Sequence, residues 1–167
     1  MAKVVLKLGD DISTDTIYPG RFMATVLPTE TPQYAFADST EFNGRLCNNE
    51  IPRGSVILAG SNFGCGSSRE QAASTIQGHG LVIVARSFAR IFLQNAINLG
   101  LRVATCPDLF ADVGDELELT ESRVVNRTSG RSLPLVALPA ARQAIVDAGG
   151  LIPYARRRLE ETRCADA

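Results

Sequence analysis

The sequence contains a single histidine among its 167 residues, and this scarcity restricts the chemistry open to the protein. A Ser–His–Asp or Cys–His mechanism would have to use His79, and a metal site built from several histidines is impossible. His79 stands between two glycines after a predicted helix. We expect it to be a C-terminal capping residue or a surface residue, so the sequence points away from histidine-based catalysis.

Cysteines are few and far apart in the chain. The four are Cys47, Cys65, Cys106 and Cys164. Because no two of them form a CxxC or other close pair, we expect no zinc or iron–sulfur site held by this chain alone. Four free thiols in a reducing compartment are the simplest interpretation, since cytosolic disulfides are rare.

The sequence also lacks an excess of charge of either sign and lacks a long apolar run. Seventeen basic and eighteen acidic residues leave a net charge of −1, which argues against binding to nucleic acid or to an anionic membrane surface. No apolar run approaches the ~20 residues that a membrane span needs, and the N-terminus has no apolar signal core. We therefore expect one domain over residues 1–167, located in the cytoplasm.

The middle of the chain alternates buried strands with helices. Apolar runs at 55–59, 81–85 and 101–105 are separated by predicted helices at 68–77 and 87–99. The second helix is expected to open on Ser87 as its cap and to close on Gly100. This order predicts parallel strands joined by helical crossovers. The other expected elements are strands at 3–8, 115–119, 123–127 and 133–138, a weak helix at 31–42, a helix at 139–148 and a solvated, charged helix in the tail. The fold class is therefore α/β, with a parallel β-α-β core and additional mixed or antiparallel strands.

The glycine-rich segment 60–70 (GSNFGCGSSRE) follows a buried strand and precedes a helix. In α/β sheets, ligands bind at the carboxyl ends of the strands, where such loops meet helix N-termini. The free N–H groups of a helix N-terminus favour an anion. Arg69, expected in the first turn of the helix, is a cation that opposes the helix dipole unless an anionic ligand compensates it. The segment thus predicts a carboxylate or phosphate site.

Ser67 and Ser68 in this segment allow two interpretations. A serine alkoxide stabilised by the same N–H groups and by Arg69 could act as a base without a histidine. Alternatively, one serine caps the helix, with Glu70 or Gln71 completing a capping box. Cys65 is a thiol at a helix N-terminus, but no base lies within sequence reach, and we do not expect it to be a nucleophile.

Segment 60–70 resembles the signature of the swivelling domain of the aconitase superfamily, and most closely that of the small subunits of 3-isopropylmalate dehydratases. Further blocks of that family resemble residues 9–21, 85–92, 95–101 and 106–108. The resemblance implies a swivelling β/β/α domain that closes over a separate large subunit. It also implies that a 4Fe–4S cluster is held by cysteines of the large subunit and that this chain binds no cofactor or metal.

The resemblance further implies an activity and residue roles. The reaction is dehydration of a 2-hydroxy acid and rehydration with the hydroxyl on the neighbouring carbon, a step of leucine biosynthesis. Ser67 matches the serine base of the family, Arg69 a ligand of a substrate carboxylate, and Ser68 a helper at the same carboxylate. Many relatives have histidine where this chain has Gln71. Because serine is the base of the family, we expect the residue at this position to support the site without contacting the substrate.

The family's specificity loop corresponds to residues 22–25, which are Phe22, Met23, Ala24 and Thr25. Relatives that resemble homoaconitase carry an arginine where Ala24 stands, and that arginine pairs with an extra carboxylate. Burying an unpaired carboxylate is costly, so these apolar residues favour a malate with an alkyl substituent, and 3-isopropylmalate fits best. The alternatives are a dimethylmalate- or homoaconitate-type hydro-lyase, and a non-catalytic module that binds carboxylate or phosphate.

Overall fold

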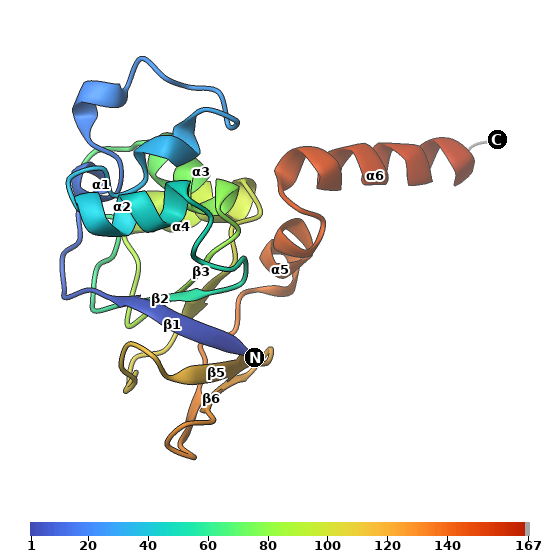
Figure 1. Ribbon diagram of the computed structural model, residues 1–167. Helices are drawn as coiled ribbons and strands as arrows, with labels where there is room; N and C mark the ends of the chain where they lie inside the picture. Colours follow the sequence, from blue (N-terminus) through green and yellow to red (C-terminus); the bar gives the residue numbers. More distant parts are fainter. Residues whose placement is uncertain (166–167) are drawn as a thin grey trace.

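The computed structural model describes residues 1–165, with side chains for residues 1–163. The chain folds around one seven-stranded sheet in the order β4-β3-β2-β1-β5-β6-β7 (Figure 1). The strands are β1 (Ala2–Lys7), β2 (Val56–Ala59), β3 (Val82–Ala85), β4 (Val103–Thr105), β5 (Glu116–Leu119), β6 (Arg123–Asn126) and β7 (Ser132–Pro134). The strands from β4 to β1 pair in parallel, whereas β5, β6 and β7 extend the sheet antiparallel from β1. The predicted α/β class, with a parallel core and added antiparallel strands, is confirmed.

Helices gather on one face of the parallel half of the sheet (Figure 1). They are α1 (Thr14–Ile17), α2 (Thr40–Cys47), α3 (Glu70–Gly78) and α4 (Arg90–Asn98), with single 3-10 turns η1 (Gly20–Phe22) and η2 (Thr31–Tyr34). After β7 the chain forms α5 (Ala140–Asp147), which packs on α4, and then α6 (Leu151–Ala165). Within residues 1–165, no helix combines the length and the apolar character needed to cross a membrane.

The central strands are buried on both faces, which explains their continuous apolar runs. In β2, Ile57 and Ala59 belong to the cluster beneath the helices. Val56 and Leu58 alternate with them and belong to a second cluster, with Leu117 of β5, on the opposite face. A strand with both faces covered has no polar side, so β2 reads in the sequence as an unbroken hydrophobic segment.

The expected helix at 31–42 was wrong. Residues Thr31–Tyr34 form only a 3-10 turn, and the helix that follows, α2, runs over Thr40–Cys47. Between them Phe36 adopts a left-handed backbone with φ of 52°, which no α-helix can contain. Its ring is buried and meets Phe42 edge-on at a centroid distance of 5.5 Å. The packing of the Phe36 ring therefore outweighs the helix propensity of this segment and interrupts the expected helix.

The expected cap at Ser87 was also wrong. Helix α4 begins at Arg90, and Ala89 is its N-cap without any side-chain capping bond. The Ser87 hydroxyl instead accepts a hydrogen bond of 2.8 Å from the N–H of Asn62, in the glycine-rich loop after β2. The other end of the helix was predicted correctly, because Gly100 follows it with a φ of 71°.

Candidate active site

Two loops meet at the carboxyl ends of the neighbouring parallel strands β1 and β2. Their backbones are joined by five long-range hydrogen bonds, three of which are 2.9 Å or shorter. The N–H of Gly64 donates to Ile12 O at 2.8 Å, that of Thr14 to Cys65 O at 2.8 Å, and that of Asp11 to Ser61 O at 2.9 Å. The glycine-rich loop therefore lies at the predicted edge of the sheet, and the loop after β1 forms part of the same site.

Aspartates of the first loop hold the second loop in place. Asp10 Oδ1 accepts a 2.6 Å hydrogen bond from the N–H of Ser61, and Asn62 Nδ2 donates to Asp11 Oδ1 at 2.7 Å. A Cβ atom at Gly60 would lie only 2.0 Å from Asp10 Oδ1. The close approach of Asp10 thus requires glycine at position 60.

Gly64 forces the turn that presents the serines. Its φ is 81°, in the region that favours glycine, and a Cβ atom there would lie 2.2 Å from Cγ of Phe92. Beyond this turn Gly66, Ser67 and Ser68 are exposed. Within the described chain, their backbone N–H groups donate no hydrogen bond, so three adjacent donors are free to bind an anion.

Neither serine caps the helix, which rules out the capping interpretation. Helix α3 begins at Glu70, and its N-cap is Arg69 with an extended backbone and no side-chain capping bond. The loop is fixed through main-chain atoms, because Thr14 Oγ1 donates to the carbonyl of Ser67 at 2.9 Å. The hydroxyls of Ser67 and Ser68 have no hydrogen-bond partner in the part of the chain that the structure describes, and both remain available for chemistry.

Arg69 is the N-cap residue just before helix α3 and does not lie in its first turn, where it was expected, and its charge already has a partner. The side chain is 12% exposed and forms an ion pair with Asp15. It also donates a long hydrogen bond of 3.4 Å to the carbonyl of Tyr18. A bound anion is therefore not the only way to compensate this cation. Arg69 Nε is buried and unpartnered within the described residues, a rare state for a guanidinium nitrogen.

Asp15 is the residue of this site that sequence reasoning missed. The hydrogen bond from Arg69 lowers the pKa of the Asp15 carboxyl below its usual value. The same carboxylate accepts a hydrogen bond of 3.2 Å from the N–H of Gly20. Asp15 therefore links Arg69 to the start of the proposed specificity loop. The only sequence signal was the density of aspartates between positions 10 and 15.

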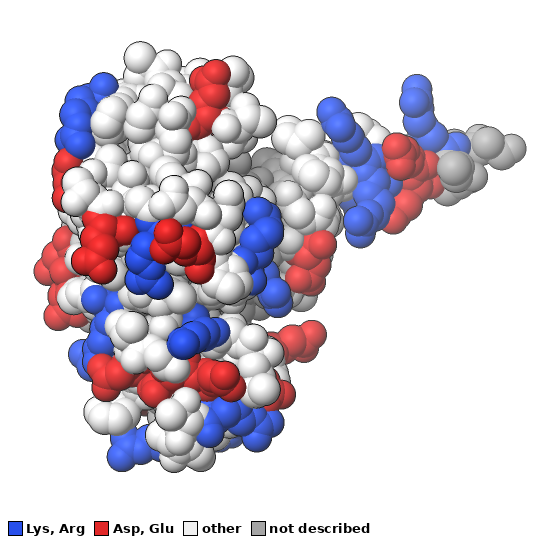
Figure 2. Space-filling model, viewed as in Figure 1, with Lys and Arg blue, Asp and Glu red and all other residues white. Residues whose placement is uncertain are grey.

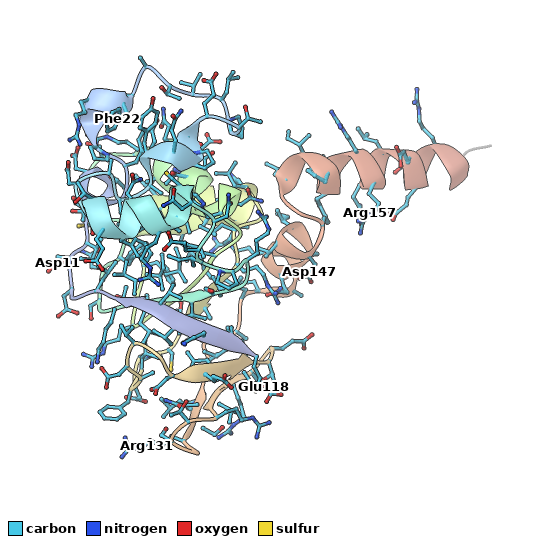
Figure 3. The ribbon with its side chains drawn as sticks, viewed as in Figure 1. Asp11, Phe22, Glu118, Arg131, Asp147 and Arg157 are labelled. Carbon is cyan, nitrogen blue, oxygen red and sulfur yellow. The ribbon has the colours of Figure 1, made fainter. Side chains whose placement is uncertain are left out.

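The predicted specificity loop, residues 22–25, rises above the helical layer, where Figure 3 labels Phe22. The Phe22 ring stacks on Tyr34 at 4.1 Å between centroids and meets Tyr18 edge-on at 6.5 Å. The Tyr18 hydroxyl lies within hydrogen-bond distance of the carbonyls of Phe22, at 3.0 Å, and Thr25, at 3.2 Å. Phe22 and Thr25 therefore anchor the loop to the core.

The other two loop residues expected to contact substrate have exposed side chains. Met23 is 43% exposed, and Ala24 is exposed beside it. The base of the loop lies close to Arg69, since a Cβ atom at Gly20 would be 3.4 Å from Nη2 of Arg69. The structure thus brings the loop and the arginine together through Gly20.

His79 and the cysteines stand mostly outside this site. His79 is the C-cap of α3, as expected, and its Nε2 lies 2.8 Å from the carbonyl of Pro32. Cys47, Cys65 and Cys106 are free thiols, and burial raises the pKa of the Cys106 thiol. The side chain of Cys164 lies outside the described residues. Among those described, no three histidine, cysteine or acidic side chains gather as a metal site would require.

Comparison with known proteins gives a consistent result. The family model described as "Aconitase C-terminal domain" matches residues 12–106. The chain is 44% identical over 160 residues to a 3-isopropylmalate dehydratase small subunit of Methanosarcina mazei, covering 93% of this chain and 96% of that protein. It is 37% identical over 164 residues to an isopropylmalate/citramalate isomerase small subunit of Methanocaldococcus jannaschii, covering 95% of each. A crystal structure of 3-isopropylmalate dehydratase from Methanocaldococcus jannaschii superposes with a TM-score of 0.85 at 33% identity, over 99% of this chain and 98% of that chain.

Proposed function

Because the chain belongs to the family of 3-isopropylmalate dehydratase small subunits, built on the aconitase C-terminal domain, we propose that its Ser67 loop completes the active site of a large subunit. The chain is a component of a hydro-lyase of leucine biosynthesis, and the name of its relatives implies a large-subunit partner. The proposal rests on one observation: two exposed serines that do not cap the helix stand beside a nearly buried arginine, at the carboxyl ends of two parallel strands.

Ser67 is the proton carrier of the isomerisation. Its alkoxide removes the proton from C3 of 2-isopropylmalate, the C–H electron pair forms the double bond, and the C2 hydroxyl leaves as water after taking up a proton. Water then adds to C3, and Ser67 returns its proton to C2, so atoms balance and no redox partner is needed. The free N–H groups of residues 66–68 stabilise the alkoxide, as oxyanion donors do.

Arg69 and Ser68 bind a carboxylate of the substrate. A guanidinium matches a carboxylate in a bidentate manner, and Arg69 Nε has no partner among the described residues. The substrate carboxylate would share the guanidinium with Asp15 or displace it, since the Asp15 side chain is 59% exposed and can move into water. The Ser68 hydroxyl donates to the same carboxylate.

The donors of this loop suit an organic anion, because they are hydroxyls, amide N–H groups and a guanidinium. We place the 4Fe–4S cluster of the family on the large subunit, where it would supply Lewis-acid activation of the leaving hydroxyl. This chain contributes the proton carrier and the carboxylate ligand. It works with the large subunit in the cytoplasm.

Met23 and Ala24 select the substituent of the substrate. Both side chains are exposed on a loop whose base touches Arg69. An apolar contact at this place favours an alkyl group and leaves an extra carboxylate unpaired. The substrate is therefore an alkyl malate, with 3-isopropylmalate preferred. Citramalate is a second candidate, because it appears in the name of the Methanocaldococcus jannaschii relative.

The test is reconstitution with the large subunit encoded in the same genome. Turnover is measured with 3-isopropylmalate, citramalate, dimethylmalate and homocitrate, and the expected order places 3-isopropylmalate first and homocitrate last. Faster turnover of homocitrate would contradict the loop argument. Failure to form any active complex, together with tight binding of malate or phosphate by this chain alone, would favour the non-catalytic module instead.

A further inference from the structure

Tyr18 lies between the helical core and the predicted specificity loop. Its side chain is fully buried, at 0% exposure, and a phenol hydroxyl that leaves water needs a hydrogen-bond partner. The acceptors within reach are the carbonyls of Phe22, at 3.0 Å, and Thr25, at 3.2 Å. Burial raises the pKa of the Tyr18 hydroxyl, so it remains a donor at neutral pH.

These two carbonyls stand at the two ends of one turn. Residues 22–25 form this turn, which is closed by a 2.9 Å hydrogen bond from the N–H of Thr25 to the carbonyl of Phe22. Met23 and Ala24 are its central residues, and both side chains are exposed. The single buried hydroxyl of Tyr18 therefore contacts both ends of the turn that presents Met23 and Ala24.

The short segment that leads from Tyr18 to the turn is also held by hydrogen bonds. The N–H of Phe22 donates to the carbonyl of Pro19 at 3.0 Å, and that of Met23 donates to the carbonyl of Gly20 at 3.1 Å. These bonds form the 3-10 turn η1. The segment thus starts at the main chain of Tyr18 and returns to the side chain of the same residue.

The main chain of Tyr18 contacts the other half of the proposed substrate site. Its carbonyl accepts a hydrogen bond of 3.4 Å from Nη1 of Arg69, and its N–H donates to the carbonyl of Thr14 at 2.8 Å. Arg69 is the proposed ligand of the substrate carboxylate, whereas Met23 and Ala24 are proposed to meet the substituent. One buried residue is therefore bonded to both parts of the site.

The surface over this segment suits an uncharged substituent. Figure 2 shows that the top of the molecule, where Figure 1 draws the chain between α1 and α2, is mostly uncharged. An alkyl group gains from an apolar contact roughly in proportion to the area that it covers. A larger alkyl group is therefore more sensitive than a methyl group to the position of the turn.

We propose that Tyr18 is a positioning residue that sets the substrate selectivity, an inference that rests on the proposed function of Arg69 and of the turn. Its hydroxyl holds Met23 and Ala24 at a fixed distance from Arg69, so that an isopropyl group fits against the turn while the carboxylate is bound. Tyr18 itself does not touch the substrate. Without the hydroxyl the turn moves more freely, and a large substituent loses a contact that a methyl group hardly makes.

The experiment compares Tyr18→Phe with wild type in the enzyme reconstituted with the large subunit. The substrates are 2-isopropylmalate and citramalate, since both are 2-alkyl malates and differ only in the alkyl group. The ratio of kcat/KM for 2-isopropylmalate to that for citramalate should fall by about 2–10-fold, the factor that corresponds to one hydrogen bond. Citramalate is also measured as a competitive inhibitor, so the comparison does not depend on its turnover.

The kinetic constants distinguish positioning from general damage to the fold. The fall should appear as a higher KM for 2-isopropylmalate with kcat unchanged, because the lost contact is made equally in the ground state and the transition state. A variant with a damaged site would instead lose kcat with both substrates, and that result contradicts the proposal.

Tyr34→Phe is the matched control. Tyr34 meets Tyr18 edge-on at 6.1 Å between ring centroids, and its hydroxyl makes no hydrogen bond within the described chain. The control therefore removes the same atom from the same aromatic cluster without releasing the turn, and its selectivity should equal that of wild type. An equal fall in Tyr34→Phe would assign the effect to ring packing and overturn the proposal.

Met23→Ala separates this inference from the proposed function on which it rests. The side chain is exposed, and its truncation should itself lower the selectivity ratio. If Met23→Ala lowers the ratio and Tyr18→Phe does not, the role of Tyr18 is overturned while the role of the loop stands. If neither variant lowers the ratio, the loop does not meet the substituent and both proposals are overturned.

Amide exchange of the wild-type chain supplies a readout that needs no variant. The N–H of Thr25 closes the turn, so it should exchange more slowly than an amide of an open loop. In Tyr18→Phe its protection should fall by about 2–10-fold. Unprotected exchange of Thr25 in wild type would show that the turn is not held, and would overturn the proposal even if Tyr18→Phe did not fold.

Discussion

Gly64 offers the most quantitative test of the site's construction, because two separate penalties apply to any side chain there. Alanine at a φ of 81° costs about 1–2 kcal/mol. Its Cβ would lie 2.2 Å from Cγ of Phe92, and such overpacking costs typically about 1–3 kcal/mol more. Gly64→Ala should therefore lower the free energy of unfolding by about 2–5 kcal/mol.

Two other glycines separate these penalties. Gly54 has a φ of 84° and nothing within 4 Å of a built Cβ, so Gly54→Ala should show the backbone cost alone. Gly44 lies in α2 with open space around it, and Gly44→Ala should stabilise the protein by about 0.5–1 kcal/mol. The free energies are measured by denaturant unfolding of the isolated chain. If Gly64→Ala and Gly54→Ala lower the free energy of unfolding equally, the close contact with Phe92 has no cost and that part of the reasoning is refuted. If Gly64→Ala leaves the free energy of unfolding unchanged, the left-handed turn at Gly64 is refuted as well.

Three further changes test the charges and the specificity loop. Asp15→Asn should destabilise the chain at pH 7, because the hydrogen bond from Arg69 lowers the pKa of Asp15 and so favours folding while the carboxyl is ionised. That contribution is present above the unfolded pKa of about 3.9 and is lost as pH falls through the lower folded value. Unfolding of both proteins at pH 7, 5 and 3.5 checks this, and a difference that does not shrink in acid contradicts it. Arg69→Lys should raise KM of the reconstituted enzyme by about 10–100-fold with a smaller change in kcat, since a bidentate charged contact of about 1.5–3 kcal/mol is lost; an unchanged KM removes Arg69 from the substrate. Ala24→Arg should improve kcat/KM for homocitrate relative to 3-isopropylmalate by about tenfold or more, and unaltered relative rates would show that this position does not meet the substituent.

The elements predicted well were those whose signal is local. The apolar runs of β2 and β3 are buried on both faces, so their type and place followed from hydrophobicity alone. Gly100 was read correctly as the end of α4, because a left-handed residue after a helix is a local requirement.

The failures came from contacts between distant parts of the chain. Ser87 resembles a helix cap in the sequence, but its hydroxyl accepts from Asn62, 25 positions earlier. Phe36 breaks the expected helix because its ring is buried against Phe42. A one-dimensional pattern contains no information on which distant group competes for a side chain.

In the candidate site too, features with a local signal could be predicted, whereas contacts between distant residues could not. The loop, its position at the sheet edge and the exposed serines could be predicted, because a glycine-rich turn after a buried strand has few alternatives. The partner of Arg69 could not, since Asp15 stands 54 positions away and comes close only through the parallel pairing of β1 with β2.

The central claim is that Ser67 carries the proton, and Ser67→Ala in the reconstituted enzyme tests it most directly. The side chain is exposed and makes no hydrogen bond within the described chain, so the variant should fold and bind the large subunit as wild type does. Its kcat with 3-isopropylmalate should fall by about 10²–10⁴-fold, the usual contribution of a positioned acid–base group, with little change in KM. Ser61→Ala, an exposed serine of the same loop, is the matched control and should keep its activity. A Ser67→Ala enzyme whose kcat stays close to that of the Ser61→Ala control would contradict the account.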